Sequence, residues 1–269
     1  MFDAPLKRTR NVLVLTYWTF RSGLVQAYTL PYVRMISRRL RPGGRITLVT
    51  FEQPTMELGG TAQIEARAAL AAEGIDWVAF GYHRFGLTAL ISAGWALAAI
   101  IVLCFRRQIE SIHCFCLPAG AIGSLISMVT RTPLVIDSYE PHAEAMVDYG
   151  VWRRSSLAYR LLFALERFQS HRASAVIAAA PAMRDYARSR YGVEFSRFEF
   201  KPACVDLRDF SQARDLQGAL RKKLGFEGKI VCVYAGKTGG VYLEREIFEF
   251  FRVASDFWRG RFKALVLSS

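Results

Sequence analysis

The feature that most constrains the fold is the regular alternation of short, mostly apolar runs with longer segments of helical length. Apolar runs of this kind are typical of strands buried on both faces of a parallel sheet. They occupy residues 11–16, 45–50, 75–80, 109–115, 133–137, 175–178 and 198–200. The helical segments between them include residues 24–40, 61–72, 86–105, 156–171 and 182–191. Such alternation predicts right-handed crossovers between parallel strands, so we expect a Rossmann-like α/β domain.

A second unit of the same kind is expected to begin near residue 229. Its first strand, residues 230–235, is followed by a glycine-rich turn, a helix and one more apolar stretch before Ser269. About 40 residues cannot bury both faces of a parallel sheet. We therefore expect an N-terminal fragment of a two-domain protein, or one half of a split protein. The predicted parts are a Rossmann-like domain over residues 1–205, a linker over 206–228 and an incomplete second domain over 229–269.

The charge balance predicts an anionic partner. The chain carries a formal net charge of +13, and the excess lies in short basic clusters. These clusters are residues 7–10, 38–41, 106–107, 153–154 and 221–223. Nucleic acid, an anionic membrane and a phosphorylated substrate would all suit this charge. Because we find no nucleic-acid-binding motif, we expect a nucleotide and a membrane rather than nucleic acid.

Residues 86–105 form a run of 20 residues without a charged side chain, which is long enough to cross a bilayer. A membrane-spanning helix is one interpretation. However, the run connects two predicted strands of one sheet, and a span would separate them. We therefore expect a helix packed on the sheet with one face that touches lipid. No signal-peptide pattern opens the chain, so we expect a cytoplasmic protein, peripheral on the inner membrane face.

The cysteine pattern predicts neither disulfides nor a metal centre. The five cysteines are Cys104, Cys114, Cys116, Cys204 and Cys232, an odd number without zinc-ribbon spacing. Buried, reduced thiols in a cytosolic protein are the expected state.

Ligands of an open parallel sheet gather beyond the carboxyl ends of its strands, so the loops there are the candidate sites. Gly23 follows the first strand and precedes a helix, where backbone amides approach anions. A glycine that serves only a tight turn is an equal alternative. Tyr82 and His83 follow the third strand. His113 lies inside the fourth apolar run, where a satisfied core histidine is as good an interpretation as a ligand contact.

The most polar of these loops covers residues 137–142, directly after the fifth strand. Asp137 and Glu140 supply hydrogen-bond acceptors, and His142 titrates near neutral pH, which suits the binding of sugar hydroxyls. We predict these three residues as the catalytic and acceptor-binding group. The alternative is that Asp137 caps the next helix and His142 is merely exposed.

A glycine-rich turn over residues 235–241 is the candidate phosphate site of the second unit. A P-loop would need a glycine five residues before Gly236, and that position holds Val231, so we expect no ATP hydrolysis. Glycines still allow close backbone approach, and a helix from about Tyr242 directs its positive end to the turn. The predicted diphosphate-binding residues are Gly236, Lys237, Gly239 and Gly240.

With these motifs the chain resembles the GT-B-fold glycosyltransferases that use nucleotide sugars, a group that includes bacterial lipid mannosyltransferases and sucrose synthases. The resemblance runs from Asn11 to the end. It is carried by the Gly23 loop, Ile112-His113, residues 137–142, residues 175–178 with 182–184, and residues 201–210. It implies a complete N-terminal Rossmann-like domain over residues 1–205 that binds the acceptor. It also implies that residues 229–269 are the first βαβ part of a second such domain, which binds the nucleotide sugar.

The resemblance also implies the reaction and the residue roles. A sugar would pass from a nucleotide-diphosphate sugar to a polysaccharide or lipid-linked acceptor, with no cofactor besides the donor and no metal. Gly23 would lie near the donor phosphates, His142 near the reacting sugar and Lys237 against the diphosphate, although the family often has its histidine closer to the strand end. Only Arg245 is near enough to be a second phosphate contact, and it lacks the family's context.

The paired glutamates that the family carries late in its second domain have no counterpart before Ser269, so we expect negligible turnover by these residues alone. The main alternative is a non-catalytic, membrane-associated, acceptor-binding subunit of a split glycosyltransferase. A sugar-nucleotide epimerase of the same fold is a third interpretation.

Overall fold

The computed structural model describes residues 9–82, 87–210, 213–238 and 242–268. These residues fall into two compact units. The first lies within Met1–Ala143 and Arg160–Pro202, and the second within Glu144–Tyr159 and Ala203–Ser269.

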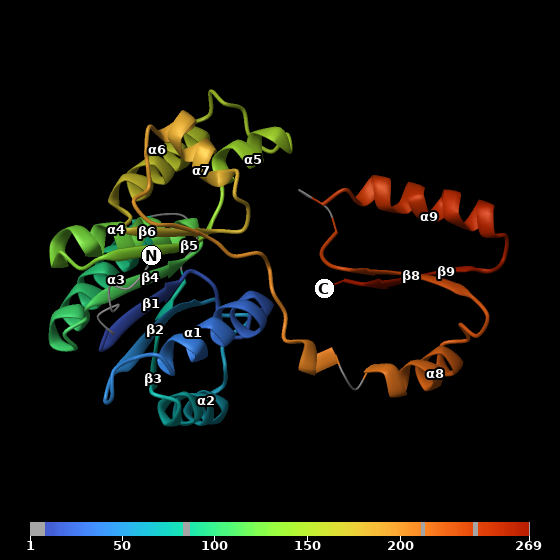
Figure 1. Cartoon of the computed structure of the whole chain (residues 1–269), viewed down its shortest axis with the longest axis horizontal. Helices are drawn as coiled ribbons and strands as arrows, with labels where there is room; N and C mark the ends of the chain where they lie inside the picture. Colours follow the sequence, from blue (N-terminus) through green and yellow to red (C-terminus); the bar gives the residue numbers. More distant parts are fainter. Residues whose placement is uncertain (1–8, 83–86, 211–212, 239–241, 269) are drawn as a thin grey trace, which may run out of the picture. The chain divides into compact units, whose positions relative to one another are not determined.

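The first unit is built on a seven-stranded sheet with the order β3-β2-β1-β4-β5-β6-β7 (Figure 1). All neighbouring strands pair in parallel. The strands are β1 Asn11–Thr16, β2 Arg45–Glu52, β3 Ile75–Gly81, β4 Ser111–Phe115, β5 Leu134–Tyr139, β6 Ala175–Ala178 and β7 Phe198–Phe200. The predicted Rossmann-like parallel sheet is confirmed. From β1 the chain adds β2 and β3 on one side of the sheet, and it then continues with β4 to β7 on the other side. Parallel sheets bind ligands at the carboxyl ends of the strands where this change of side occurs, which here are β1 and β4.

The helices of the chain follow the predicted alternation. Two predicted helices each begin or end with a short π-helical segment, η1 Val25–Thr29 before α1 Leu30–Ser37, and η2 Ala187–Tyr191 after α7 Met183–Tyr186. The other helices are α2 Gly60–Ala72, α3 Leu87–Arg106, α4 Leu117–Thr130, α5 His142–Asp148, α6 Leu157–Arg172, η3 Leu207–Phe210, α8 Ala213–Lys223 and α9 Glu244–Trp258.

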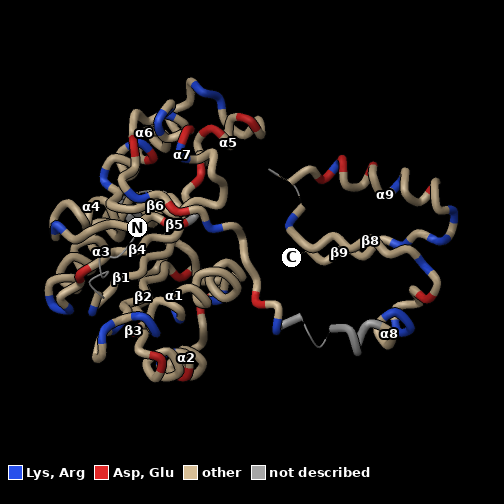
Figure 2. Tube along the Cα trace, in the orientation of Figure 1, with Lys and Arg blue, Asp and Glu red and all other residues tan. Residues whose placement is uncertain are grey.

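The described basic residues form several separate groups along the chain. Figure 2 shows separate groups of basic residues on each unit, including a run at the end of α8 where Arg221, Lys222 and Lys223 lie. Some basic residues of the first unit are neutralised locally. Arg45 and Arg107 both pair with Asp76, at 2.5 Å and 3.2 Å.

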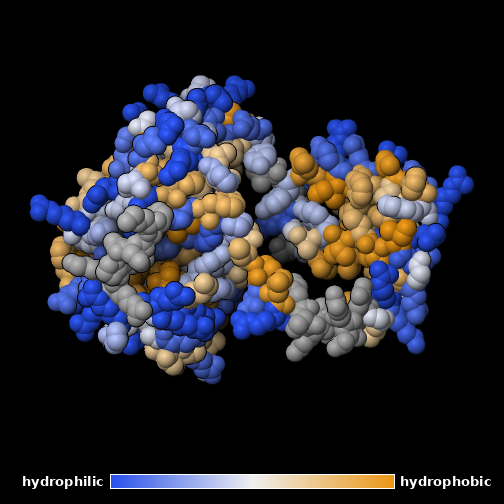
Figure 3. Space-filling view, in the orientation of Figure 1, coloured by the Kyte–Doolittle hydropathy of each residue, from blue (hydrophilic) through white to orange (hydrophobic). Residues whose placement is uncertain are grey.

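The second unit has a small sheet of two parallel strands, β8 Ile230–Ala235 and β9 Phe262–Leu267. Of the apolar side chains described in this unit, only Ala254 and Phe262 are buried. The others are partly or fully exposed, and Figure 3 shows apolar colouring over α9 and the two strands. The described part of this unit therefore lacks the packed layers that stabilise an α/β domain.

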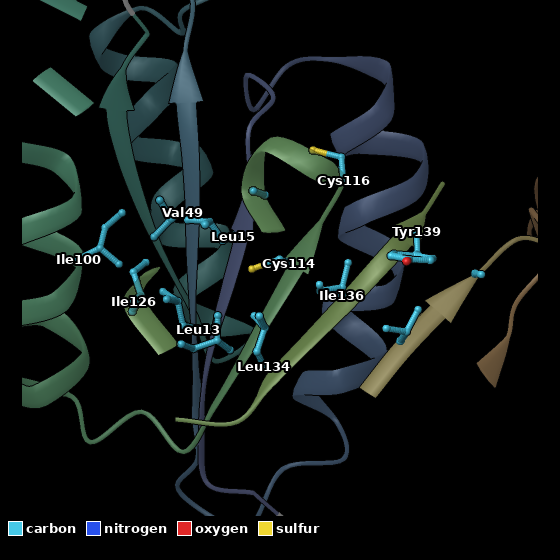
Figure 4. Close-up of a cluster of buried hydrophobic side chains, with 14 of the residues drawn as sticks. Leu13, Leu15, Val49, Ile100, Cys114, Cys116, Ile126, Leu134, Ile136 and Tyr139 are labelled. Carbon is cyan, nitrogen blue, oxygen red and sulfur yellow. The ribbon is translucent and has the colours of Figure 1, made fainter. Parts of the chain in front are cut away.

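The sheet of the first unit has a separate apolar core on each face, because successive strand residues point to opposite sides. Leu13 and Leu15 of β1 face α3 and α4, and Figure 4 shows them with Ile100 of α3 and Ile126 of α4. Val12 and Val14 face the opposite side, with side chains of α1 and α2. Burial of both faces explains why the strands read as continuous apolar runs.

The long apolar helix α3 packs on the sheet through one of its faces. Ala96, Ile100 and Cys104 are buried in the core that contains Leu13 and Leu15. The opposite face of α3 is exposed, with Trp95 at 68% and Phe105 at 60%. Among the described residues, no helix is both long and apolar enough to cross a membrane.

Candidate functional site

The centre of the candidate site is Asp137, near the end of β5, whose side chain is 2% exposed. Its carboxylate binds groups from three other parts of the first unit. The Tyr28 hydroxyl donates to Oδ1 at 3.3 Å, while His113 Nε2 and Lys201 Nζ lie 3.2 Å and 2.6 Å from Oδ2. These contacts give Asp137 partners in η1, β4 and the segment after β7. Asp137 thus joins three distant parts of the first unit through polar contacts. In the alternative interpretation it would instead cap the following helix.

The partners of Asp137 keep it ionised. Burial alone raises the pKa of Asp137, but hydrogen bonds and charge from His113 and Lys201 outweigh it, so the pKa is lowered from its ordinary value. A carboxylate with a lowered pKa and bonded oxygens is a poor proton acceptor at neutral pH. The geometry therefore favours Asp137 as a residue that positions His113 and Lys201.

Lys201 is enclosed by aromatic rings as well as paired with Asp137. Its Nζ lies 3.6 Å from the ring centroid of Tyr32, 4.8 Å from that of Tyr28 and 5.5 Å from that of Phe115. Cation–π attraction of this kind strengthens where the cation is removed from water. Lys201 and Asp137 line one end of a cavity of about 770 Å³ between α1 and the sheet.

His142 and Glu140 form a second polar cluster, which is more exposed. His142 Nδ1 lies 3.5 Å from Glu140 Oε1, with side chains 42% and 62% exposed. The hydrogen bond to Glu140 is the main reason that the pKa of His142 is raised. His142 therefore retains its proton closer to neutral pH and can donate a hydrogen bond. The three residues predicted from the sequence thus belong to two clusters.

A buried carboxylate that sequence reasoning missed anchors the backbone beside His142. Glu166 of α6 is 1% exposed, and its carboxylate accepts hydrogen bonds from the Ala143 amide and the Tyr191 hydroxyl, both at 2.8 Å. Burial raises the pKa of Glu166, although these hydrogen bonds oppose the shift. Glu166 thereby ties the start of α5 to α6.

Gly23 opens the helical segment after β1, as predicted. Ser22 precedes it and caps the segment, with its Oγ 3.3 Å from the Val25 amide. The loop is held by the buried Glu52 of β2, whose carboxylate accepts the Phe20 amide at 3.1 Å. Gly23 itself is exposed, and the first amides of a helix have no partner within it. The loop therefore presents a helix N-terminus at the carboxyl edge of the sheet.

In the second unit, Gly236 and Lys237 follow β8 and are exposed. The Gly236 amide donates to the Leu267 carbonyl at 3.0 Å, and the Tyr234 hydroxyl donates to the Lys237 carbonyl. Gly239 and Gly240 lie outside the described residues. The following helix begins at Glu244, later than the predicted start near Tyr242, and Leu243 is its N-cap. Arg245 pairs with Glu249 at 3.1 Å.

Further candidates for chemistry are the possible metal ligands and the three buried cysteines of the first unit, Cys104, Cys114 and Cys116. Within the parts of the chain that the structure describes, no group of three His, Cys, Asp or Glu side chains could hold a metal ion. Cys104, Cys114 and Cys116 are buried, and burial raises the pKa of each thiol. A raised pKa makes these thiols unreactive.

Several solved structures have a similar architecture, among them a UDP-glucosyltransferase and a sucrose-phosphate synthase. HepE from Anabaena, in complex with UDP and glucose, aligns with a TM-score of 0.57 and 14% identity over 96% of this chain, which spans 61% of HepE. Sucrose-phosphate synthase from Thermosynechococcus elongatus aligns with a TM-score of 0.59 and 11% identity, over 97% of this chain and 71% of the synthase. A UDP-glucosyltransferase from Polygonum tinctorium gives a TM-score of 0.53 and 14% identity, over 97% of this chain and 72% of that enzyme.

At these identities the likeness establishes the fold alone. No curated protein matches the chain. The model of the glycosyl transferase 4-like domain, however, matches residues 28–204, which is more than half of the chain. The chain therefore belongs to the glycosyl transferase 4-like domain family, with the GT-B fold that the resemblance implied.

Proposed function

We propose that this chain takes part in the transfer of a sugar from a nucleotide-diphosphate sugar to a polysaccharide or lipid-linked acceptor. The observation that carries the proposal is the family match, which extends over most of the first unit. The fold neighbour HepE, solved with UDP-glucose in another crystal, supports a nucleotide sugar as the donor. We propose no metal and no cofactor besides this donor.

The proposed roles follow the position of each residue. The helix N-terminus at Gly23 would bind donor phosphate, since its amides and dipole favour an anion. His142, whose pKa is raised by its hydrogen bond to Glu140, would contact the reacting sugar. Asp137 would hold His113 and Lys201 in place. Gly236 and Lys237, with Gly239 and Gly240, would contact the diphosphate and stabilise it as it departs.

We further propose that these 269 residues alone turn over negligibly. The described second unit offers one small sheet, and its Gly236 and Lys237 are exposed to water. An exposed cation binds a diphosphate weakly, because water competes for both charges.

Binding of UDP to the purified chain tests the donor assignment. We expect saturable binding with a dissociation constant near about 1 mM. Lys237→Met should weaken it about fivefold, the upper range for one exposed charge pair. The matched control is Lys223→Met, which removes an exposed lysine at the end of α8. An absence of UDP binding, or an equal loss in both variants, would contradict the assignment.

A non-catalytic, acceptor-binding subunit of a split glycosyltransferase is the second candidate. It is favoured by the contrast between the two units, since the first has a core on each sheet face and the second has little buried apolar surface. The reading frame beyond the codon of Ser269 discriminates between the candidates. An in-frame continuation favours one enzyme, whereas a separate adjacent frame for the remaining domain favours a split pair.

We also propose that the first unit contacts an anionic membrane from the cytoplasmic side. The exposed faces of α3 and α4 carry apolar side chains that the core does not use. These are Ile91, Trp95, Val102 and Phe105 of α3, and Leu125, Met128 and Val129 of α4, each at least 44% exposed. The helices end near the exposed Arg106 and Arg131. Apolar side chains flanked by arginines favour the interface of an anionic bilayer.

Vesicle binding tests this contact. The double variant Trp95→Ser with Phe105→Ser should bind vesicles of phosphatidylglycerol and phosphatidylcholine at least about tenfold more weakly, since each side chain contributes about 1.5–3 kcal/mol when buried. The control is Met35→Ser with Ile64→Ser, which removes two exposed apolar side chains of α1 and α2. Equal binding by both double variants in co-sedimentation would show that α3 does not make the contact.

A further inference from the structure

A second cavity of the first unit, distinct from the one beside Lys201, lies on the side of the sheet covered by α3 and α4. Its volume is about 330 Å³, within the range of small-molecule sites. Its walls come from the ends of β1, β2 and β3 and from the two helices. The side chains that shape it include Tyr17, Phe51, Tyr82, Leu97 and Ile122.

The cavity exists because α3 carries small residues where it passes the strand ends. Ser92, Ala93, Gly94 and Ala96 all line it. A Cβ atom added at Gly94 would meet no atom within 4 Å, so the space beside this residue is open. The aromatic rings opposite are fixed by one another. Tyr17 lies 5.2 Å from Phe51 and 5.7 Å from Tyr82 between ring centroids.

The cavity has mainly apolar walls, with two tyrosines among its lining residues. Tyr17 directly follows β1 and Tyr82 directly follows β3, so both residues lie at the carboxyl edge of the sheet, where the Gly23 loop also lies. Burial is the main cause that raises the pKa of Tyr17, so its hydroxyl is protonated and can donate. Leu97 of α3 and Ile122 and Leu125 of α4 give the cavity apolar walls. An amphipathic ligand fits this combination.

The mouth of the cavity opens among the exposed apolar side chains of α3 and α4. Ala93, Gly94 and Leu125 line the cavity and are also exposed. Trp95 is beside them in the chain, and its ring packs against Phe80 at 5.9 Å. A hydrocarbon chain that left a bilayer contacted by this face would enter without crossing water.

We propose that this cavity binds the hydrocarbon chain of a lipid-linked acceptor and holds its polar head at the carboxyl edge of the sheet. The proposal rests on the proposed sugar transfer and selects the lipid-linked class among its acceptors. The polar head would then lie at the edge where sheets of this type bind their ligands.

Calorimetric titration with decyl phosphate tests the proposal, with butyl phosphate and inorganic phosphate as comparisons. We expect saturable binding of decyl phosphate below its micellar concentration. Butyl phosphate and inorganic phosphate should bind at least tenfold more weakly, because the decyl hydrocarbon chain supplies most of the contact with the cavity. Ala93→Leu and Gly94→Leu, which fill the cavity, should each weaken decyl phosphate binding at least tenfold. Leucine is a better helix former than glycine, so Gly94→Leu should leave α3 folded.

Ala98→Leu is the matched control, since Ala98 is exposed on α3 and does not line the cavity. It should bind decyl phosphate as the wild type does. Binding of phosphatidylglycerol vesicles distinguishes ligand binding in the cavity from general contact with a membrane. Ala93→Leu and Gly94→Leu should bind these vesicles as the wild type does. Equal decyl phosphate binding by all variants, or parallel loss of vesicle and decyl phosphate binding, would overturn the proposal. Because no donor is present, either failure leaves the UDP result of Lys237→Met unaffected.

Discussion

Asp137→Asn should lower the free energy of unfolding of the first unit by about 3 kcal/mol at pH 7. The substitution removes the negative charge that both His113 and Lys201 contact, and leaves Lys201, whose side chain is 18% exposed, without its counter-ion. Removal of one partner from a buried ion pair is costly because the other charge stays out of water. Urea unfolding followed by circular dichroism measures the change.

The effect of Asp137→Asn should depend on pH in a defined direction. The pKa of Asp137 is lowered in the folded protein from its ordinary value of 3.8. A carboxylate of this kind contributes stability that is present above its unfolded pKa and is lost as the pH falls through its folded pKa. The difference between wild type and variant should therefore be full at pH 7 and pH 5, and should shrink at pH 3.

Two further variants make the test specific. Asp185→Asn removes an exposed aspartate of the same unit and should leave the stability almost unchanged. Lys201→Met combined with Asp137→Asn should cost less than the sum of the two single changes, since neither charge then remains unpaired. A loss for Asp137→Asn no larger than that for Asp185→Asn, or additive single effects, would mean that the pair does not stabilise the unit.

Gly123→Ala should destabilise the first unit by about 2 kcal/mol, although alanine is the better helix former. Gly123 lies in α4 where the helix meets β4. A Cβ atom added there would lie 2.2 Å from Sγ of Cys114 and 3.2 Å from Cδ1 of Leu134. Both neighbours are fully buried, so the overlap must be relieved by shifting the helix from the sheet. Urea unfolding again measures the loss.

The cause of this loss can be isolated with two comparisons. Gly94→Ala adds the same methyl group to α3 in open space and should raise the stability by about 0.5–1 kcal/mol. Cys114→Ala removes the sulfur atom that the new methyl group would overlap. It should therefore lower the free energy of unfolding less in the Gly123→Ala variant than in the wild type, or even raise it. If Gly123→Ala stabilises the protein as Gly94→Ala does, the close approach of α4 to β4 is not required.

The strands and most helices were predictable from the sequence because their signals are local. Continuous apolar runs placed β1, β2, β3, β5, β6 and β7 within about two residues, since the burial of both faces removes polar residues from a strand. The run over residues 109–115 begins as a strand only at Ser111. The chain turns at Gln108, whose φ is 49°, before the strand starts.

The contacts of the site were not predictable in the same way. Asp137 was recognised as a polar residue after a strand, but its partners Tyr28 and Lys201 are 109 and 64 residues away. Glu166 and Glu52 gave no signal, because each lies in an otherwise ordinary helix or strand. Their importance comes from the hydrogen bonds that they accept from distant backbone amides, that of Ala143 at the start of α5 and that of Phe20 in the loop after β1.

The sequence by itself determined the alternation of strands and helices, the parallel sheet and the edge at which ligands should bind. Only the tertiary structure decided which polar groups at that edge meet. The order β1-β4-β5 puts His113 beside Asp137, and the return of the chain after β7 brings Lys201 to the same carboxylate. Local periodicity carries no information on such pairs, because the energy of a buried contact depends on distance in space and not on separation along the chain.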